Sequence, residues 1–113
     1  MVEVTPREVR IYITLDGKRP YKNWLDSLKD VKAVAKIEAR IDRLESGNFG
    51  GVKGVGRSVC ELRIDYGPGY RVYFGQIGAT VVLLLCGGDK STQAQDILKA
   101  QEYWSNYRSR EDA

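Results

Sequence analysis

Histidine is absent from the 113 residues of this chain, and methionine (1), cysteine (2) and proline (3) are scarce. Without histidine the chain has no Ser-His-Asp triad, no Cys-His dyad and no histidine-based metal site. Two cysteines alone cannot complete a structural zinc site. An enzyme built from this sequence must therefore take its acid and base from Lys, Arg, Tyr, Glu or Asp, and we expect neither metal nor cofactor.

Long apolar runs are also missing, since no segment approaches the ~20 residues of a transmembrane helix. The N-terminal sequence MVEVTPREVR lacks the layout of a signal peptide. Cys60 and Cys86 fall in segments that are predicted to be strands. Free buried cysteines, which behave as small hydrophobic residues, are favoured over a disulfide between them. These features predict a cytoplasmic protein without a membrane partner.

The composition that remains is that of an ordinary globular protein, with 42% hydrophobic and 29% charged residues. The length suits a single domain over residues 1–113. Eighteen basic residues against fifteen acidic ones give a net charge of +3. This mild excess permits an acidic partner without requiring one, so the arrangement of the charges is more informative than their sum.

The segment Val59–Lys90 carries most of the informative polar residues and is predicted to form three strands. Val59–Asp65 and Tyr70–Gln76 alternate between apolar and polar residues, which is typical of half-buried strands. The turn residues Tyr66–Gly69 between them indicate a hairpin. Thr80–Cys86 is apolar throughout, as expected for a central strand that is covered on both faces.

If the first two of these strands pair, one face of the hairpin holds Glu61, Arg63, Arg71 and Tyr73, with Lys90 at the end of the sheet. Cations and a phenol on a rigid sheet suit a phosphate backbone. The alternation predicts that Arg71 faces solvent, so the core is not expected to depend on it. Two simpler interpretations stay open. Lys90 is then a solvated loop lysine, and Glu61 forms an ion pair with Arg63 or Arg71 instead of accepting a proton.

The remaining segments predict one more strand and three helices. Glu8–Leu15 alternates, with its odd-numbered residues toward the core. Helices are expected at Tyr21–Leu28, Val31–Glu45 and Gln93–Tyr107, the last with Thr92 as its N-cap. The predicted fold class is therefore α+β: an N-terminal strand, a helical hairpin packed on a mainly antiparallel four-stranded sheet, and a C-terminal helix.

Further basic residues are candidates for contacts with RNA phosphates. In the second predicted helix they recur every three or four residues, at Lys29, Lys32, Lys36, Arg40 and Arg43. A solvated face, partly balanced by acidic residues, is the favoured interpretation unless other features indicate RNA. The glycine-rich segment Ser46–Ser58 is predicted to be a mobile loop that carries Lys53 and Arg57. It is not a P-loop, because a P-loop follows a strand and begins a helix.

Three short stretches resemble a known superfamily: ELR at 61–63, GPGYRVY at 67–73 and LLCGGDKSTQ at 84–93. Trp24, Asp96, Ile97 and Ala100 fit the same pattern. With the order of strand, helical hairpin and three-strand meander, the chain is similar to the RelE/ParE toxin superfamily. Within it, the chain most resembles the phage-derived, HigB-like addiction module killer proteins, and the resemblance spans nearly the whole sequence.

This resemblance implies a RelE-like fold and the toxin of a type II toxin–antitoxin pair, held inactive by a helix-turn-helix antitoxin encoded beside it. RelE-like toxins enter the ribosomal A site and cut mRNA, which makes the ribosome and mRNA the implied partners. Arg71 and Lys90 resemble basic residues of the family's active site. The histidine of other members is missing here, and neither Tyr103 nor Tyr107 is assigned to their C-terminal tyrosine, so the acid and base stay open.

Such a mRNA interferase would use the RNA 2′-OH as its nucleophile. Arg63, Arg71 and Lys90 are then expected to stabilise the charge that gathers on the phosphate oxygens. Tyr73 is expected to stack on a base or to donate a proton. Two other classes stay open: a ParE-like inhibitor of DNA gyrase, which the cations on the sheet disfavour, and an inactive toxin-derived binding module.

Overall fold

The computed structural model describes residues 6–111, and within this range the chain forms five strands and three α-helices. The strands make one mixed sheet in the order β1-β5-β4-β3-β2. They are β1 (Glu8–Ile11), β2 (Val52–Gly54), β3 (Val59–Ile64), β4 (Tyr70–Ile77) and β5 (Val81–Gly88). The helices are α1 (Pro20–Ser27), α2 (Val31–Glu45) and α3 (Gln93–Glu111), with a 3₁₀ turn at Lys90–Thr92. None of the helices in the described range is long and apolar enough to cross a membrane.

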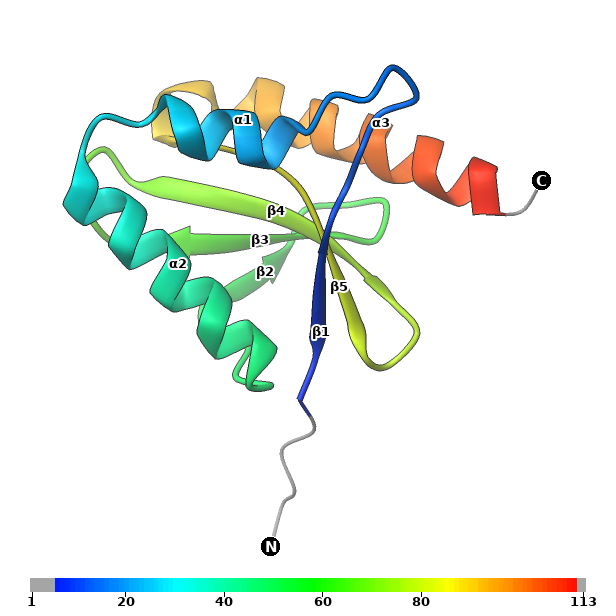
Figure 1. Cartoon of the computed structure of the whole chain (residues 1–113), viewed down its shortest axis with the longest axis horizontal. Helices are drawn as coiled ribbons and strands as arrows, with labels where there is room; N and C mark the ends of the chain where they lie inside the picture. The colour runs from blue at the N-terminus through cyan, green and yellow to red at the C-terminus, as the bar shows by residue number, and fades with distance from the viewer. Residues whose placement is uncertain (1–5, 112–113) are drawn as a thin grey trace, which may run out of the picture.

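The predicted α+β class, with an N-terminal strand, a helical pair and a C-terminal helix, is confirmed (Figure 1). Four strands were predicted, whereas the sheet within residues 6–111 has five. Val52–Gly54, which was assigned to a mobile loop, pairs antiparallel with β3 at the edge of the sheet. A strand of three residues that ends in a glycine is too short to show alternation, so the sequence pattern did not reveal it. At the opposite edge β1 joins β5 in parallel, while the other pairings are antiparallel.

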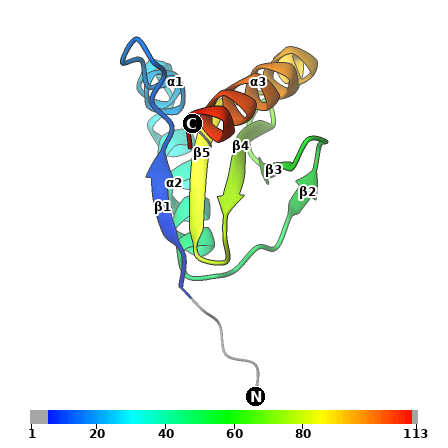
Figure 2. The same ribbon diagram turned by 90° about the vertical axis from the view of Figure 1, so that its right-hand side faces the viewer.

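Helices cover both faces of the sheet. On one face α1 and α2 pack against Leu62, Val72 and Phe74, and on the other α3 packs against Val59 and Tyr73. Figure 2 shows α3 and α1 on opposite sides of β5. The central strand β5 is covered on both faces, as predicted, but so is β4, which was expected to be half-buried. This second cover buries three polar residues of β3 and β4, namely Glu61, Arg71 and Tyr73.

The N-terminal strand is shorter than predicted, and its inward face is different. It ends at Ile11, and Leu15, which was assigned to the core, is 76% exposed. Tyr12, which was assigned to the solvent face, is buried, and its hydroxyl donates a hydrogen bond of 2.7 Å to Asn106 on α3. Ile11 and Ile13, also assigned to the core, are 37% and 43% exposed. The alternation was wrong here because β1 is an edge strand with mostly exposed residues, whereas Tyr12, just after it, packs against α3.

The limits of α1 and α2 were predicted to within one residue, whereas α3 continues to Glu111, four residues beyond the predicted end, and its predicted cap was wrong. α2 spans Val31–Glu45 as expected, and the Asp30 carboxylate accepts hydrogen bonds from its first amides. The chain before α3 is capped earlier than predicted, because the Asp89 carboxylate accepts from the Ser91 amide. Thr92, the predicted cap, donates its hydroxyl to Asp96 instead. Lys90 therefore lies in a fixed 3₁₀ turn between β5 and α3.

Close contact between α3 and β4 depends on Gly75. A methyl group at this position would lie 2.3 Å from the ring of Trp104, which is itself buried. We expect Gly75→Ala to lower the free energy of unfolding by about 1–3 kcal/mol, because the helix must shift to admit the methyl group. Gly54→Ala is the matched control, since no described atom lies within 4 Å of its new methyl group. Urea denaturation measures both, and equal stability of the two variants would contradict this packing.

Candidate functional site

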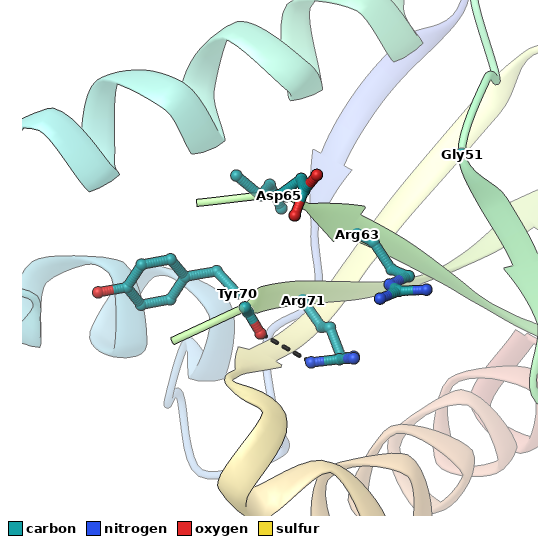
Figure 3. Close-up of a pocket in the computed structure, with 7 residues that line it drawn as sticks. Gly51, Arg63, Asp65, Tyr70 and Arg71 are labelled. Carbon is teal, nitrogen blue, oxygen red and sulfur yellow. Dashed lines mark hydrogen bonds between the residues drawn. The ribbon is translucent and has the colours of Figure 1, made fainter. Parts of the chain in front are cut away.

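Three basic residues converge at the turn between β3 and β4. Arg63 and Arg71 are direct cross-strand partners, and Figure 3 shows both side chains extending to the same side while the Tyr70 ring points away. Gly69 links them to Lys90: a methyl group built on Gly69 would lie 3.3 Å from Arg71 Nη1 and 3.7 Å from Lys90 Cβ. We call Arg63, Arg71 and Lys90 the cation cluster. Arg63 and Arg71 lie side by side, as predicted, and the first carbon of the Lys90 side chain lies beside the same turn.

A hollow surface adjoins the cation cluster. One cavity of about 330 Å³ is lined by Arg63 and Arg71, together with Gly51, Ile64, Asp65, Gly69 and Tyr70 (Figure 3). A second cavity of about 610 Å³ shares Arg63 and Asp65 with the first and extends along α2. We call the two together the basic groove. Arg63 and Arg71 of the cation cluster lie in its lining.

The basic groove contains only some of the residues predicted to bind RNA. Lys36, Arg40 and Arg43 of α2 line it, so the stripe on this helix lies next to Arg63 of the sheet. Lys53 lies instead on β2, opposite Glu61, and Arg57 lies against α3 beside Gln101. These last two residues do not line the basic groove, although Lys53 shares a face of the sheet with Glu61.

Two residues of the stripe on α2 have partners that fix them in place. The Arg40 guanidinium donates a hydrogen bond to the Gly50 carbonyl, which holds the chain just before β2 against the helix. The Lys36 ammonium lies 5.2 Å from the centre of the Tyr66 ring, a cation–π distance. Lys36 is exposed all the same, and Arg43 is exposed beside it. Both can reach a ligand in the basic groove.

Arg71 is buried rather than solvent-facing, which corrects the prediction. Its residue is 5% exposed, because α3 covers this face of the sheet. Its Nε lies 3.6 Å from Glu61 Oε2, and its Nη1 donates a hydrogen bond of 2.7 Å to the Gly69 carbonyl. The interpretation of Glu61 as an ion-pair partner of Arg71 is therefore confirmed. Arg63 and Lys90, by contrast, are exposed.

Tyr73 lies behind the cation cluster, where it has no exposed face. Its hydroxyl donates a hydrogen bond of 3.1 Å to Glu61 Oε2. Burial, followed by the charge of Glu61, raises the pKa of Tyr73 well above its ordinary value. The ring therefore cannot stack on a base in this arrangement, and its proton is held by a carboxylate. Both roles predicted for Tyr73 conflict with this geometry.

Gln93 is a member of this group that sequence reasoning missed. Its side-chain amide donates a hydrogen bond of 2.9 Å to the same Glu61 oxygen from the first residue of α3. Gln93 lies within the stretch that resembles the toxin superfamily, which is the signal that could have drawn attention to it. No periodicity distinguishes it from other polar residues at the start of a helix.

The chemistry available at the cation cluster is electrostatic. Both cysteines are free, as predicted, and burial raises the pKa of Cys86 to about 12, so its thiol stays protonated at neutral pH. Within residues 6–111 no group of three or more Cys, Asp or Glu side chains is arranged to hold a metal ion. Fixed cations at the end of a groove can bind a phosphate and stabilise added charge on it.

No family model matches this chain. It is 54% identical over 81 residues to a protein of Haemophilus influenzae that is named only as an uncharacterized protein. The matched region covers 72% of this chain and 82% of that protein. The chain therefore belongs to the same family as this Haemophilus influenzae protein.

Proposed function

We propose that this protein is the toxin of a type II toxin–antitoxin pair and inhibits translation by cutting mRNA on the ribosome. The observation that carries the proposal is the pairing of Arg63 and Arg71 in the lining of the basic groove, with Lys90 beside the same turn. The resemblance to the RelE/ParE superfamily, and to its HigB-like branch, supplies the reaction and the expected antitoxin partner. A sheet with a helical pair on one face and a C-terminal helix on the other is compatible with a RelE-like fold.

The proposed reaction needs no nucleophile from the protein. The RNA 2′-oxygen bonds to the adjacent phosphorus as the bond to the 5′-oxygen breaks; the 2′-OH loses a proton, and the 5′-oxygen gains one. Negative charge grows on the phosphate oxygens in the transition state, and each well-placed donor is worth about 3–4 kcal/mol there. Arg71 is held by Glu61 and Gly69, so it supplies a fixed donor. Arg63 and Lys90 are exposed and supply the donors that close on the substrate.

The stripe on α2 would bind the phosphates that lead into the site, which can be tested by the salt dependence of binding. Each phosphate contact to single-stranded RNA contributes about 0.7 to the slope of log K against log salt concentration. We expect Lys36→Gln with Arg43→Gln to reduce the slope by about 1.4. The measurement is anisotropy of an RNA oligonucleotide that carries 2′-deoxy sugars and is therefore not cut. Lys53→Gln, on β2 and outside the basic groove, is the matched control. An unchanged slope in the double variant would remove α2 from the RNA path.

The function itself is tested by comparing ribosome-bound mRNA with free RNA. Because the chain has no histidine to act as a general base near neutral pH, we expect positioning in the A site to speed cleavage by at least about a hundredfold. Mapping mRNA 5′ ends after induction, and after cleavage with purified ribosomes, measures this. Equal cleavage of free RNA would contradict the dependence on the ribosome. Growth arrest without any cut mRNA, but with loss of DNA supercoiling by gyrase, would identify a ParE-like inhibitor instead.

The antitoxin is the partner expected beside this gene. Co-expression with the neighbouring open reading frame should relieve growth arrest and yield a complex that co-purifies.

A further inference from the structure

Glu61 is an acidic side chain in an unusual place. It lies near the middle of β3, under α3, and is 1% exposed. A buried carboxylate is unfavourable unless it is paired and hydrogen-bonded. A buried ion pair is itself weak support for stability, because apolar residues of similar size often serve as well. The presence of this charge therefore calls for an explanation other than the stability of the sheet.

One carboxylate oxygen of Glu61, on β3, contacts side chains of β4 and α3. Oε2 accepts hydrogen bonds from Tyr73 of β4 at 3.1 Å and from Gln93 of α3 at 2.9 Å. The same oxygen lies 3.6 Å from Arg71 Nε. Among the described residues, neither Glu61 Oε1 nor Arg71 Nε has a hydrogen-bond partner. The carboxylate is thus held from behind by Tyr73 and Gln93, while its charge acts on Arg71.

Arg71 is fixed from two directions by this arrangement. Glu61 lies on the side of its Nε, and the Gly69 carbonyl accepts from its Nη1 at 2.7 Å, the contact drawn as a dashed line in Figure 3. Arg71 also lines the cavity beside Arg63. A donor that is oriented before the substrate arrives needs no reorganisation in the transition state.

We propose that Glu61 is a positioning residue: held by Tyr73 and Gln93, it orients the Arg71 guanidinium toward the scissile phosphate. This inference rests on the proposed function and assigns a role to the buried carboxylate of the same site. Glu61 acts through Arg71, because it lies behind the guanidinium and its occupied oxygen faces α3 and β4 rather than the basic groove.

The test is a double-mutant cycle in single-turnover cleavage of mRNA on purified ribosomes, with the full-length chain. Glu61→Gln keeps the shape and removes the charge, and we expect it to slow cleavage about ten- to a hundredfold with little change in half-saturating ribosome concentration. In an Arg71→Lys background, where the planar fork is already lost, the same change should slow cleavage by less than about twofold. Glu102→Gln, an exposed acid on α3, is the charge-matched control.

Melting of each variant accompanies the rates. Should Glu61→Gln fail to fold, Gln93→Ala decides in its place, since Gln93 is only half-buried and its loss frees Glu61 Oε2 from one donor. Cleavage at the wild-type rate by the deciding variant overturns the positioning role. So does slowing by the same factor in the Arg71→Lys background as in the wild type. Either result leaves the proposed function standing. A wild-type chain that cuts no ribosome-bound mRNA overturns both.

Discussion

Replacing Arg71 by alanine is expected to lower the free energy of unfolding by about 3–5 kcal/mol and to slow mRNA cleavage at least about a hundredfold. The loss of stability follows from burial, since alanine leaves the Glu61 carboxylate under α3 without its counter-charge. The loss of rate follows from the missing donor at the phosphate. Urea denaturation and ribosome-dependent cleavage measure the two effects separately.

Arg63→Ala is the matched control for Arg71→Ala, because the two residues are direct cross-strand partners and line the same cavity. Arg63 is exposed, so its loss should change stability by no more than about 0.5 kcal/mol while cleavage still falls. If Arg71→Ala is as stable as the wild type, the buried pair is not formed in solution. If the folded Arg71→Ala variant cuts mRNA at the wild-type rate, the chemistry lies elsewhere.

The sequence predicted the β3–β4 hairpin and which of its residues share a face. It did not predict that α3 covers the face that carries the polar residues. Alternation and the GPG turn place Glu61, Arg63, Arg71 and Tyr73 on one face, as the register has them. Alternation says which side chains share a face and nothing about what lies over that face. Charged residues are seldom buried unless they are paired, and Arg71 was accordingly assigned to solvent. Only the packing of α3 on β4 shows that they are inside.

The basic groove was predictable in part for a similar reason. The spacing along α2 indicated a row of cations, with Lys36, Arg40 and Arg43 among its members. Their neighbour across the groove, Arg63, comes from a different element, and that contact depends on how α2 lies against β3. Lys53 and Arg57 were further candidates for RNA contacts because the segment that carries them was predicted to be a mobile loop. Lys53 lies instead on β2 opposite Glu61, and Arg57 follows this strand and lies beside Gln101 of α3, so neither lines the groove.

The buried charges can be removed altogether, and this separates their contribution to the fold from their contribution to the reaction. In the triple variant Glu61→Leu, Arg71→Met, Tyr73→Phe, no carboxylate is left without a counter-charge and no phenol without an acceptor. Apolar replacements of buried ion pairs are often neutral or stabilising by about 1–4 kcal/mol. We therefore expect this variant to regain at least the wild-type free energy of unfolding.

Cleavage by the same triple variant should stay at least about a hundredfold below the wild type, because the fixed donor at the phosphate is absent. Urea denaturation and cleavage on ribosomes again measure the two quantities, with Arg71→Ala alongside as the unstable, inactive reference. A triple variant as unstable as Arg71→Ala would mean that the charges themselves hold α3 on the sheet. A triple variant that is stable and cuts mRNA would exclude Arg71 from the reaction. Stability with inactivity is the expected result, since the fold needs this face of the sheet filled, while the reaction needs it charged.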